Sequence, residues 1–422
     1  MPMKNHPLIK SLLSLKGNPR ACVYVEPLFA IPYNLYTPFV SVYMAALLLT
    51  DKQIGLVASV NLLFRAVFAL LGGAVTDKLG RKTTTFIFDM CSWSIPCLLW
   101  ACSQNIWWFI AGAAFNGIYQ ITENSWTCLL VEDAEKSDMV KIFSMIHLAG
   151  QLAVIITPLA AFLVNKLTIV PAMRIVFLFS FLSMTAKFIL LYKFSDETQT
   201  GKIRKKETSQ MSIFKIISGY GQVFRQIFSS PGMILALSIS TFFAIATMIM
   251  NNFFGLYVTK KLSIPESYLA YYPILRSIII TVFIFVIQPR ISRFGLRAPM
   301  LIGILLYAAS HVALLLAPDK NLVLPIGYII LEACAHGLFM PRKDSIMALL
   351  IEPSERARIN GILTTITLSI SIPFGYLAGW LSDTDRRATF LLDIAIFALA
   401  FAVIAASGKL LKSDEVELGV RA

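Results

Sequence analysis

One stretch of the sequence carries polar side chains at the spacing of a single helix face. The segment from 106 to 131 is otherwise apolar, and its polar positions fall at i, i+3, i+4, i+7 and i+8. Polar groups in an apolar segment are costly, and core packing rarely needs such a stripe. The pattern therefore indicates a helix that faces a water-filled cavity and binds a polar solute. Its residues are Asn116, Tyr119, Gln120, Glu123 and Asn124.

Two arginines stand near the centres of other apolar segments. Arg65 lies within 53–76 and Arg276 within 266–288, at approximately corresponding depths of the two halves of the chain. A guanidinium offers a planar fork to a carboxylate or phosphate, so two of them facing one cavity would form an anion site. In the alternative interpretation each arginine is neutralised by an acid, for example Glu26 or Glu123. The sequence leaves both interpretations open.

Glu332 and His336 lie one turn apart near the centre of the segment 322–348. A carboxyl or imidazole group can titrate near neutral pH when its surroundings shift it, so these two and Glu123 are the best candidates for proton coupling. No catalytic assembly and no cysteine pair with metal-ligand spacing is found, so we expect no enzyme activity, no cofactor and no metal. Further candidates for the solute site are Tyr33, Asn34, Gln151 and Asn252.

These residues belong to a chain of 422 residues that is 57% hydrophobic and 14% charged, with a mean hydropathy of +0.72. Soluble proteins are about 45–50% apolar and about 25% charged. The composition excludes a soluble domain, a disordered chain, a secreted disulfide scaffold and a nucleic-acid module. The protein is expected in a lipid bilayer, where the net charge of +13 reflects membrane topology.

The chain contains twelve apolar runs long enough to cross the ~30 Å hydrocarbon core as helices. Pro and Gly interrupt them and no ten-residue alternation is present, so a β-barrel is not expected. The predicted fold is an all-α membrane protein with twelve transmembrane helices in two pseudo-symmetric six-helix bundles. The spans are 22–49, 53–76, 83–103, 106–131, 143–165, 171–193, 232–259, 266–288, 299–317, 322–348, 359–381 and 388–407.

An internal repeat supports the division into two halves. The sequence from Asn124 to Glu132 resembles, without a gap, the sequence from Asp344 to Glu352, and such weak internal similarity is typical of duplicated transporter folds. The predicted domains are 1–192, a cytoplasmic linker 193–230, and 231–422. Apolar residues at helical spacing within 211–228 predict a helix on the inner membrane surface, with a plain solvated linker as the alternative.

Most of the 37 lysines and arginines fall in the tails and the even-numbered loops, which places both termini in the cytoplasm. We therefore expect a multi-pass protein of the cell inner membrane with its second loop on the cytoplasmic side.

The second loop carries the most specific motif. It is similar to the G-x-x-x-D-[RK]-x-G-R-[RK] signature of the major facilitator superfamily, and the resemblance extends over the whole chain. Gly80 permits a tight turn between two helices, and Gly73 allows close helix approach. Asp77 can receive the N-terminal dipole of a helix, and Arg81 can reach an acid. The matching residues are Gly73, Asp77, Lys78, Gly80, Arg81 and Lys82.

In that superfamily the motif latches the cytoplasmic side of the outward-facing state, and the resemblance implies the same role here. Glu132 and Asp133 are the candidate partners of Arg81. The corresponding loop of the second half keeps Gly295 and its basic residues but has Ser292 in place of the aspartate. A weaker latch is expected there.

The resemblance implies a secondary active transporter that moves a small solute by alternating access. The buried acids and histidine favour coupling to protons, and the two central arginines favour an organic or inorganic anion as the solute. The alternatives are a multidrug or sugar transporter of the same fold, or a membrane receptor without transport. The expected partners are the solute, protons and the lipid bilayer, with no nucleic acid, and the chain is expected to be a monomer.

Overall fold

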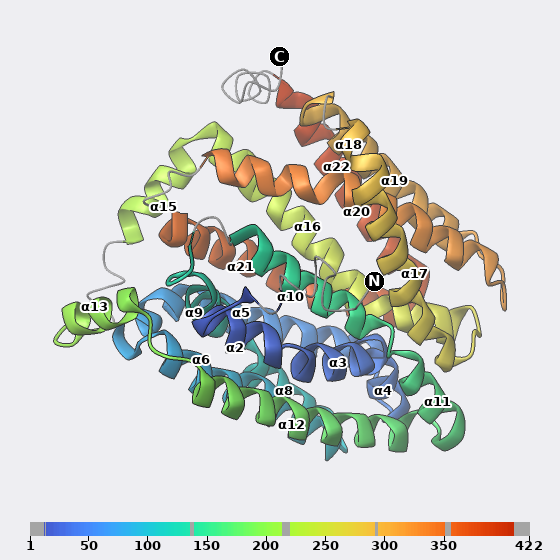
Figure 1. Ribbon diagram of the computed structural model, residues 1–422. Coiled ribbons are helices and arrows are strands. Elements are labelled where there is room, and N and C mark those ends of the chain that lie inside the picture. The colour runs from blue at the N-terminus through green and yellow to red at the C-terminus, as the bar shows by residue number, and fades with distance from the viewer. Residues whose placement is uncertain are drawn as a thin grey trace, which may run out of the picture. The chain divides into compact units, whose positions relative to one another are not determined.

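The computed structural model describes residues 12, 14–135, 139–212, 220–291, 294–350 and 356–408, and every regular element in these ranges is a helix (Figure 1). Each of the twelve predicted runs coincides with a helix or with consecutive helices, so the all-α prediction is confirmed. Ser292 and Glu352, which the sequence analysis singled out, lie outside the described residues.

The first six predicted spans correspond to helices between Gly17 and Phe194. They are α2 (Gly17–Val25), α3 (Pro27–Tyr36), η2 (Thr37–Phe39), α4 (Val40–Ala46), α5 (Asp51–Leu79), α6 (Arg81–Asp89), η3 (Met90–Ser94), α7 (Ile95–Ala101), α8 (Ile106–Gly117), α9 (Tyr119–Val131), α10 (Met139–Val154), α11 (Pro158–Leu167) and α12 (Ile169–Phe194).

The linker and the last six spans follow. The linker contains α13 (Gln199–Thr208), a helix that the sequence analysis did not predict, and α15 (Tyr220–Ser229). The remaining elements are α16 (Pro231–Leu256), η5 (Tyr257–Lys261), η6 (Glu266–Ala270), α17 (Tyr271–Val282), η7 (Phe283–Ile287), α18 (Gln288–Ile291), α19 (Arg297–Leu315), α20 (Val323–Leu350), α21 (Arg356–Thr384) and α22 (Arg386–Ala406).

Nine helices or helical runs in the described part are long and apolar enough to cross a membrane without interruption. The other three predicted spans, 22–49, 83–103 and 106–131, are divided into shorter helices. The breaks have local causes: Pro27 follows the end of α2, a π-helical turn precedes Pro96, and α8 ends at Gly117. Hydropathy predicts the length of an apolar run but not such breaks.

The chain forms two compact units. Unit 1 comprises Met1–Thr37 and Leu63–Gly219, and unit 2 comprises Pro38–Leu62 and Tyr220–Ala422. In unit 1 a hydrophobic core joins α2, α9, α10 and α12 around Cys22 and Leu130. In unit 2 a core joins α16, α19, α20 and α22 around Met300 and Ile304. The predicted domains 1–192, 193–230 and 231–422 stay a prediction.

Helix α15 lies within the segment predicted to rest on the membrane surface. Its Ile227 is fully buried against α16 and α21, whereas Phe224 and Phe228 are exposed. The earlier part of that segment, 213–219, lies outside the described residues. The surface location of this helix therefore stays a prediction.

Within unit 2, the start of α5 is held against α21 and α22 by what we call the Asp51 clasp. Asp51 is 3% exposed and accepts hydrogen bonds from Ser382 Oγ at 2.7 Å and Arg386 Nη2 at 3.1 Å. Glycines on both helices bring the backbones together, since a Cβ added at Gly379 would lie 2.9 Å from the Cα of Gly55. Ser59 Oγ donates to the carbonyl of Ile372 at 2.6 Å. The clasp consists of Asp51, Gly55, Ser59, Gly375, Gly379, Ser382 and Arg386.

Candidate functional site

A cluster in unit 2 brings together three of the predicted site residues. Arg276 on α17 donates from Nε to Glu332 Oε2 at 2.7 Å and from Nη2 to Glu332 Oε1 at 3.0 Å. Its Nη2 also lies 3.1 Å from His336 Nδ1. Glu332 and His336 sit one turn apart on α20, so one guanidinium contacts both. We call these residues the Arg276 triad.

The two charges of the triad differ in exposure. The side chain of Glu332 is 4% exposed, whereas that of Arg276 is 30% exposed. Tyr307 on α19 and Phe243 on α16 enclose His336, with the Tyr307 hydroxyl 3.5 Å from Nδ1 and the Phe243 ring centroid 6.4 Å from that of His336. The carboxylate is thus buried, whereas the guanidinium that pairs with it is partly exposed.

A second cluster, in unit 1, surrounds the other central arginine. The guanidinium of Arg65 lies 5.0 Å from the ring centroid of Tyr119, a cation–π contact. Trp93 packs against Tyr119 at 5.4 Å and against Tyr33 at 5.8 Å between centroids. Arg65 Nε is buried and has no hydrogen-bond partner among the described residues. We call Arg65, Tyr119, Trp93 and Tyr33 the Arg65 cluster.

The two arginines therefore differ, which the sequence analysis did not anticipate. Arg276 is neutralised by Glu332, not by either acid suggested from the sequence. Glu26 instead pairs with Lys187 at 3.1 Å, and Glu123 accepts a hydrogen bond from Gln120 at 2.6 Å. No ion pair within the described residues neutralises Arg65. Of the two central arginines, Arg65 is the one whose guanidinium donors are not engaged in an ion pair among the described residues.

The remaining solute-site candidates make the following contacts. Asn34 Nδ2 donates to the carbonyl of Ala30 and Asn252 Nδ2 to that of Met248, each one turn back on its own helix. Asn116 Nδ2 donates to the carbonyl of Ser92 at 3.0 Å. Gln151 is half-buried on α10. The Asn116 bond joins α8 to η3, whereas the Asn34 and Asn252 bonds stay within their own helices.

The loop motif forms a polar cluster within unit 1. Arg81 donates from Nη1 to Asp77 at 2.9 Å and from Nε to Glu132 at 3.1 Å. Of the two suggested acids, Glu132 is the one that contacts Arg81, whereas Asp133 accepts from the backbone N–H of Gln199. Burial alone would lower the pKa of Arg81, but the Glu132 hydrogen bond and the charges of Glu132 and Asp77 raise it, so Arg81 stays a cation.

A residue missed from the sequence completes this cluster. The carboxylate of Glu197 accepts from the backbone N–H groups of Arg81 at 2.8 Å and Lys82 at 3.2 Å, and so caps the N-terminus of α6. The preceding Gly80 has a φ of +88°, a conformation that favours glycine. Thr198 Oγ1 donates to Glu132 at 2.5 Å. The start of the linker is thus tied to the motif.

The other motif residues lie beside this cluster. Lys78 Nζ donates to the carbonyl of Met211 at 2.9 Å, and the Lys82 ammonium lies 4.6 Å from the Tyr192 ring centroid. Gly73 is half-buried on α5, and close approach to α9 is seen at its neighbour Gly72, where an added Cβ would lie 3.3 Å from the carbonyl oxygen of Gln120.

Replacing Asp77 by Asn is expected to leave membrane insertion intact and to shift the resting population towards the inward-facing state by about threefold to tenfold. A hydrogen bond between charged groups contributes ~1.5–3 kcal/mol, and solvent weakens this one because the Asp77 side chain is 31% exposed. Labelling of single cysteines at either membrane face measures the shift, with Asp133→Asn as the control. Unchanged labelling in Asp77→Asn would disprove the gating role.

The comparisons with known proteins agree with this architecture. The family model described as Major Facilitator Superfamily matches residues 28–275 and 237–416. No curated protein matches the sequence.

Several solved structures share the fold. The nucleoside transporter NupG has a TM-score of 0.69 at 17% identity, with 93% of this chain and 99% of that chain covered. A POT family transporter in complex with 5-aminolevulinic acid has a TM-score of 0.72 at 12% identity, with 93% and 96% covered. The human organic anion transporter MFSD10 (TETRAN) has a TM-score of 0.60 at 14% identity, with 95% and 100% covered. Identities this low establish the fold alone.

Proposed function

This chain belongs to the Major Facilitator Superfamily and is a multi-pass secondary transporter, and we propose that it carries a small solute with an anionic group together with protons. The family supplies the transporter class and its small-molecule substrate. The coupling and the charge of the solute are inferred from this chain's own residues.

The Arg276 triad is the observation that carries the proposal. Arg276 and Glu332 lie in the candidate membrane spans Glu266–Ile287 and Val323–Ile346, where an ion pair is expensive and is usually retained for function. Glu332 takes the Nε and Nη2 donors of Arg276. We propose that an anionic solute binds through the same donors, which are the ones that form a bidentate pair here. Solute and Glu332 carboxylate therefore compete for one guanidinium.

Protonation resolves this competition in favour of the solute. A proton on Glu332 removes the negative charge that holds Arg276, and His336, 3.1 Å from the same guanidinium, is placed to relay the proton. The proton thus strengthens binding of the anion at Arg276, and by linkage the anion strengthens binding of the proton to the same extent. This sign of coupling corresponds to symport.

The Arg65 cluster, within unit 1, is a solute-binding candidate in its own right. Arg65 stacks on Tyr119, and its guanidinium donors that are not used in an ion pair can bind an anion. The rings of Tyr119, Trp93 and Tyr33 offer apolar faces to an organic solute. We assign Arg65 to anion binding and Tyr33 and Tyr119 to the apolar part of the solute. Gln120 and Glu123 supply hydrogen bonds along the same helix.

The remaining features of the transport cycle follow the family pattern. We propose alternating access with the motif loop and both termini on the cytoplasmic side of the inner membrane, with Asp77, Arg81 and Glu132 as the latch and the chain acting as a monomer. The repeat and the distribution of basic residues in the sequence support this orientation.

Purified protein in liposomes tests the proposal. Under an imposed pH gradient, acid outside, the protein is expected to accumulate an organic or inorganic anion drawn from a screen, and the flux should cease when an ionophore collapses the gradient. Uptake of a neutral sugar or cationic drug instead would favour the sugar or multidrug alternative. Binding without flux would favour a receptor.

A further inference from the structure

A buried charge cluster in unit 1 plays no part in the site described above. Lys187 on α12 and Glu26, between α2 and α3, form an ion pair at 3.1 Å, with side chains 5% and 12% exposed. Asp89, the last residue of α6, is 5% exposed, interacts electrostatically with the same ammonium, and is hydrogen-bonded to Thr122. We call Glu26, Asp89 and Lys187 the Lys187 cluster.

Among the described residues, no second cation lies beside the cluster. The Lys187 ammonium lies 4.5 Å from the ring centroid of Phe29 and 5.7 Å from that of Trp126. The thiol of Cys22 on α2 interacts electrostatically with the same three groups. Glu26 Oε2 is the oxygen paired with Lys187, and apart from this ion pair it has no hydrogen-bond partner among the described residues. The cluster is therefore an ammonium and two carboxyl groups in an apolar and aromatic setting.

The charges do not balance without a proton. One ammonium neutralises one carboxylate, and a second ionised carboxylate in such a place would carry the full cost of a buried charge. A single proton held between the two acids removes that cost.

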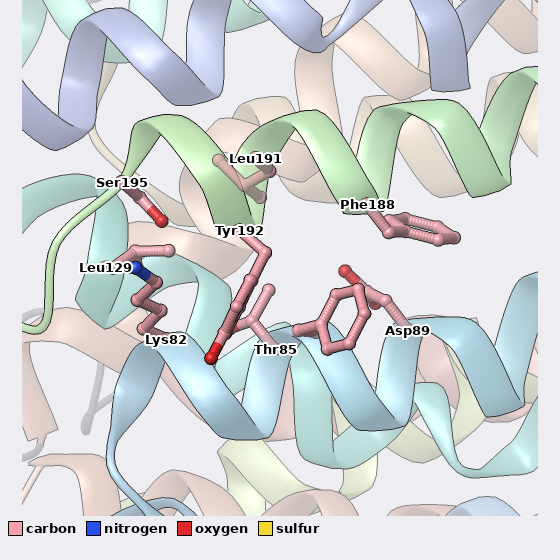
Figure 2. A pocket seen from close by; sticks show the side chains of 9 residues that line it. Lys82, Thr85, Asp89, Leu129, Phe188, Leu191, Tyr192 and Ser195 are labelled. Atoms are coloured by element: carbon pink, nitrogen blue, oxygen red, sulfur yellow. The ribbon is translucent and has the colours of Figure 1, made fainter.

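A narrow pocket, without room for a water molecule, lies between Asp89 of this cluster and the motif loop (Figure 2). Asp89 and Phe188 line one end, and Lys82 and Ser195 line the other. Ser195 is 2% exposed, and its hydroxyl has no hydrogen-bond partner among the described residues, so the pocket holds an unsatisfied polar group as well as a carboxyl.

Tyr192 divides the pocket. Its ring lies between the Ser195 end and the Asp89 end in Figure 2. It packs against Phe86 at 4.7 Å between centroids and under the Lys82 ammonium at 4.6 Å. The side chain is 42% exposed, so it can turn away from the pocket without disturbing the core. Lys82 and Tyr192 are the titratable groups that line the pocket besides Asp89.

We propose that Glu26 and Asp89 share one exchangeable proton beside Lys187, and that this proton enters and leaves through the pocket when Tyr192 turns aside. The site binds a proton independently of Glu332. A test of this site is therefore independent of a test of the proposed coupling at the Arg276 triad.

Infrared spectroscopy of the full-length protein at a series of pH values tests the shared proton. The parent should show the C=O band of a buried carboxylic acid that weakens as the pH rises. Asp89→Asn and Glu26→Gln should each lose this component, because the remaining carboxylate balances Lys187. Lys187→Met should strengthen it, because two acids then lack a cation. Asp133→Asn, at an exposed acid, should leave it unchanged. Persistence of the band in both single-acid variants would overturn the proposal.

Labelling by dicyclohexylcarbodiimide, which reacts with protonated carboxyl groups, tests the route on the same protein. Mass spectrometry should find the label on Glu26 or Asp89 at low pH, with at least a severalfold faster rate in Tyr192→Ala. Tyr24→Ala, at an exposed tyrosine of α2 outside the pocket, should label at the parent rate. Equal labelling rates in the parent and both tyrosine variants would refute the role of Tyr192 in opening the pocket. Absence of label on both Glu26 and Asp89 would refute the proton site.

Discussion

Glu332→Gln is expected to abolish solute accumulation driven by a pH gradient while retaining solute exchange across the membrane. The neutral amide imitates the protonated acid, so Arg276 is released permanently and the solute still binds. Exchange needs binding but no net proton movement, whereas accumulation needs a group that gains and loses a proton in each cycle. Exchange should stay within about threefold of the parent, a change of under ~1 kcal/mol.

Both activities are measured in the same liposomes, first with an imposed pH gradient and then with labelled solute on one side and unlabelled solute on the other. The matched control is Glu266→Gln, since Glu266 also pairs with a cation in unit 2, Lys260 at 3.5 Å, but its side chain is 25% exposed. Equal loss of both activities in Glu332→Gln would mean that Glu332 is structural or binds the solute directly.

Arg65→Lys is expected to weaken binding of a carboxylate or phosphate ligand by one to two orders of magnitude. Lysine keeps the charge but loses the planar fork and the stacking on Tyr119, and a hydrogen bond between charged groups contributes ~1.5–3 kcal/mol. Arg276→Lys should weaken binding of an anion at the Arg276 triad by a similar factor, and it should also change the pH dependence of binding, because it alters the partner of Glu332.

Calorimetry with the anion that a ligand screen returns measures this effect. Arg174→Lys is the matched control, because Arg174 also lies in an apolar helix but donates to the backbone carbonyl of Ser103 at 3.1 Å. If the best ligand is a cation, or if both variants bind an anion as tightly as the parent, the two arginines are structural counter-ions and the proposed anion site is wrong.

The helices of this protein can be predicted from sequence because membrane thickness dictates their length and the lack of water dictates their hydropathy. The partner of Arg81 could be narrowed to Glu132 or Asp133 because the motif and the end of α9 lie at the same membrane face. The role of Glu197 could not be predicted, because a single acid in a polar linker has no distinguishing sequence feature. Only the structure shows that its carboxylate caps the N-terminus of α6.

The ion pairs within the membrane could not be predicted. Arg276 and Glu332 are 56 residues apart, and their contact depends on the rotation and depth of α17 against α20, which hydropathy does not define. Lys187 stands near the end of the long apolar helix α12, where the sequence alone favours a lysine that reaches to the membrane surface. It turns inward to Glu26 because α2 ends there and brings a carboxylate within reach.

The Asp51 clasp has a consequence for biosynthesis. Asp51 and Arg386 are separated by 335 residues, and Ser59 and Ile372 by 313, so the start of α5 leaves the ribosome long before α21 and α22 exist. Contacts between such distant residues form late, after a large loss of chain entropy. During translation an aspartate and a small-residue helix face are therefore left without partners, open to chaperones, quality-control proteases and mispairing. Completion of the C-terminal helices is the step that ends this exposure.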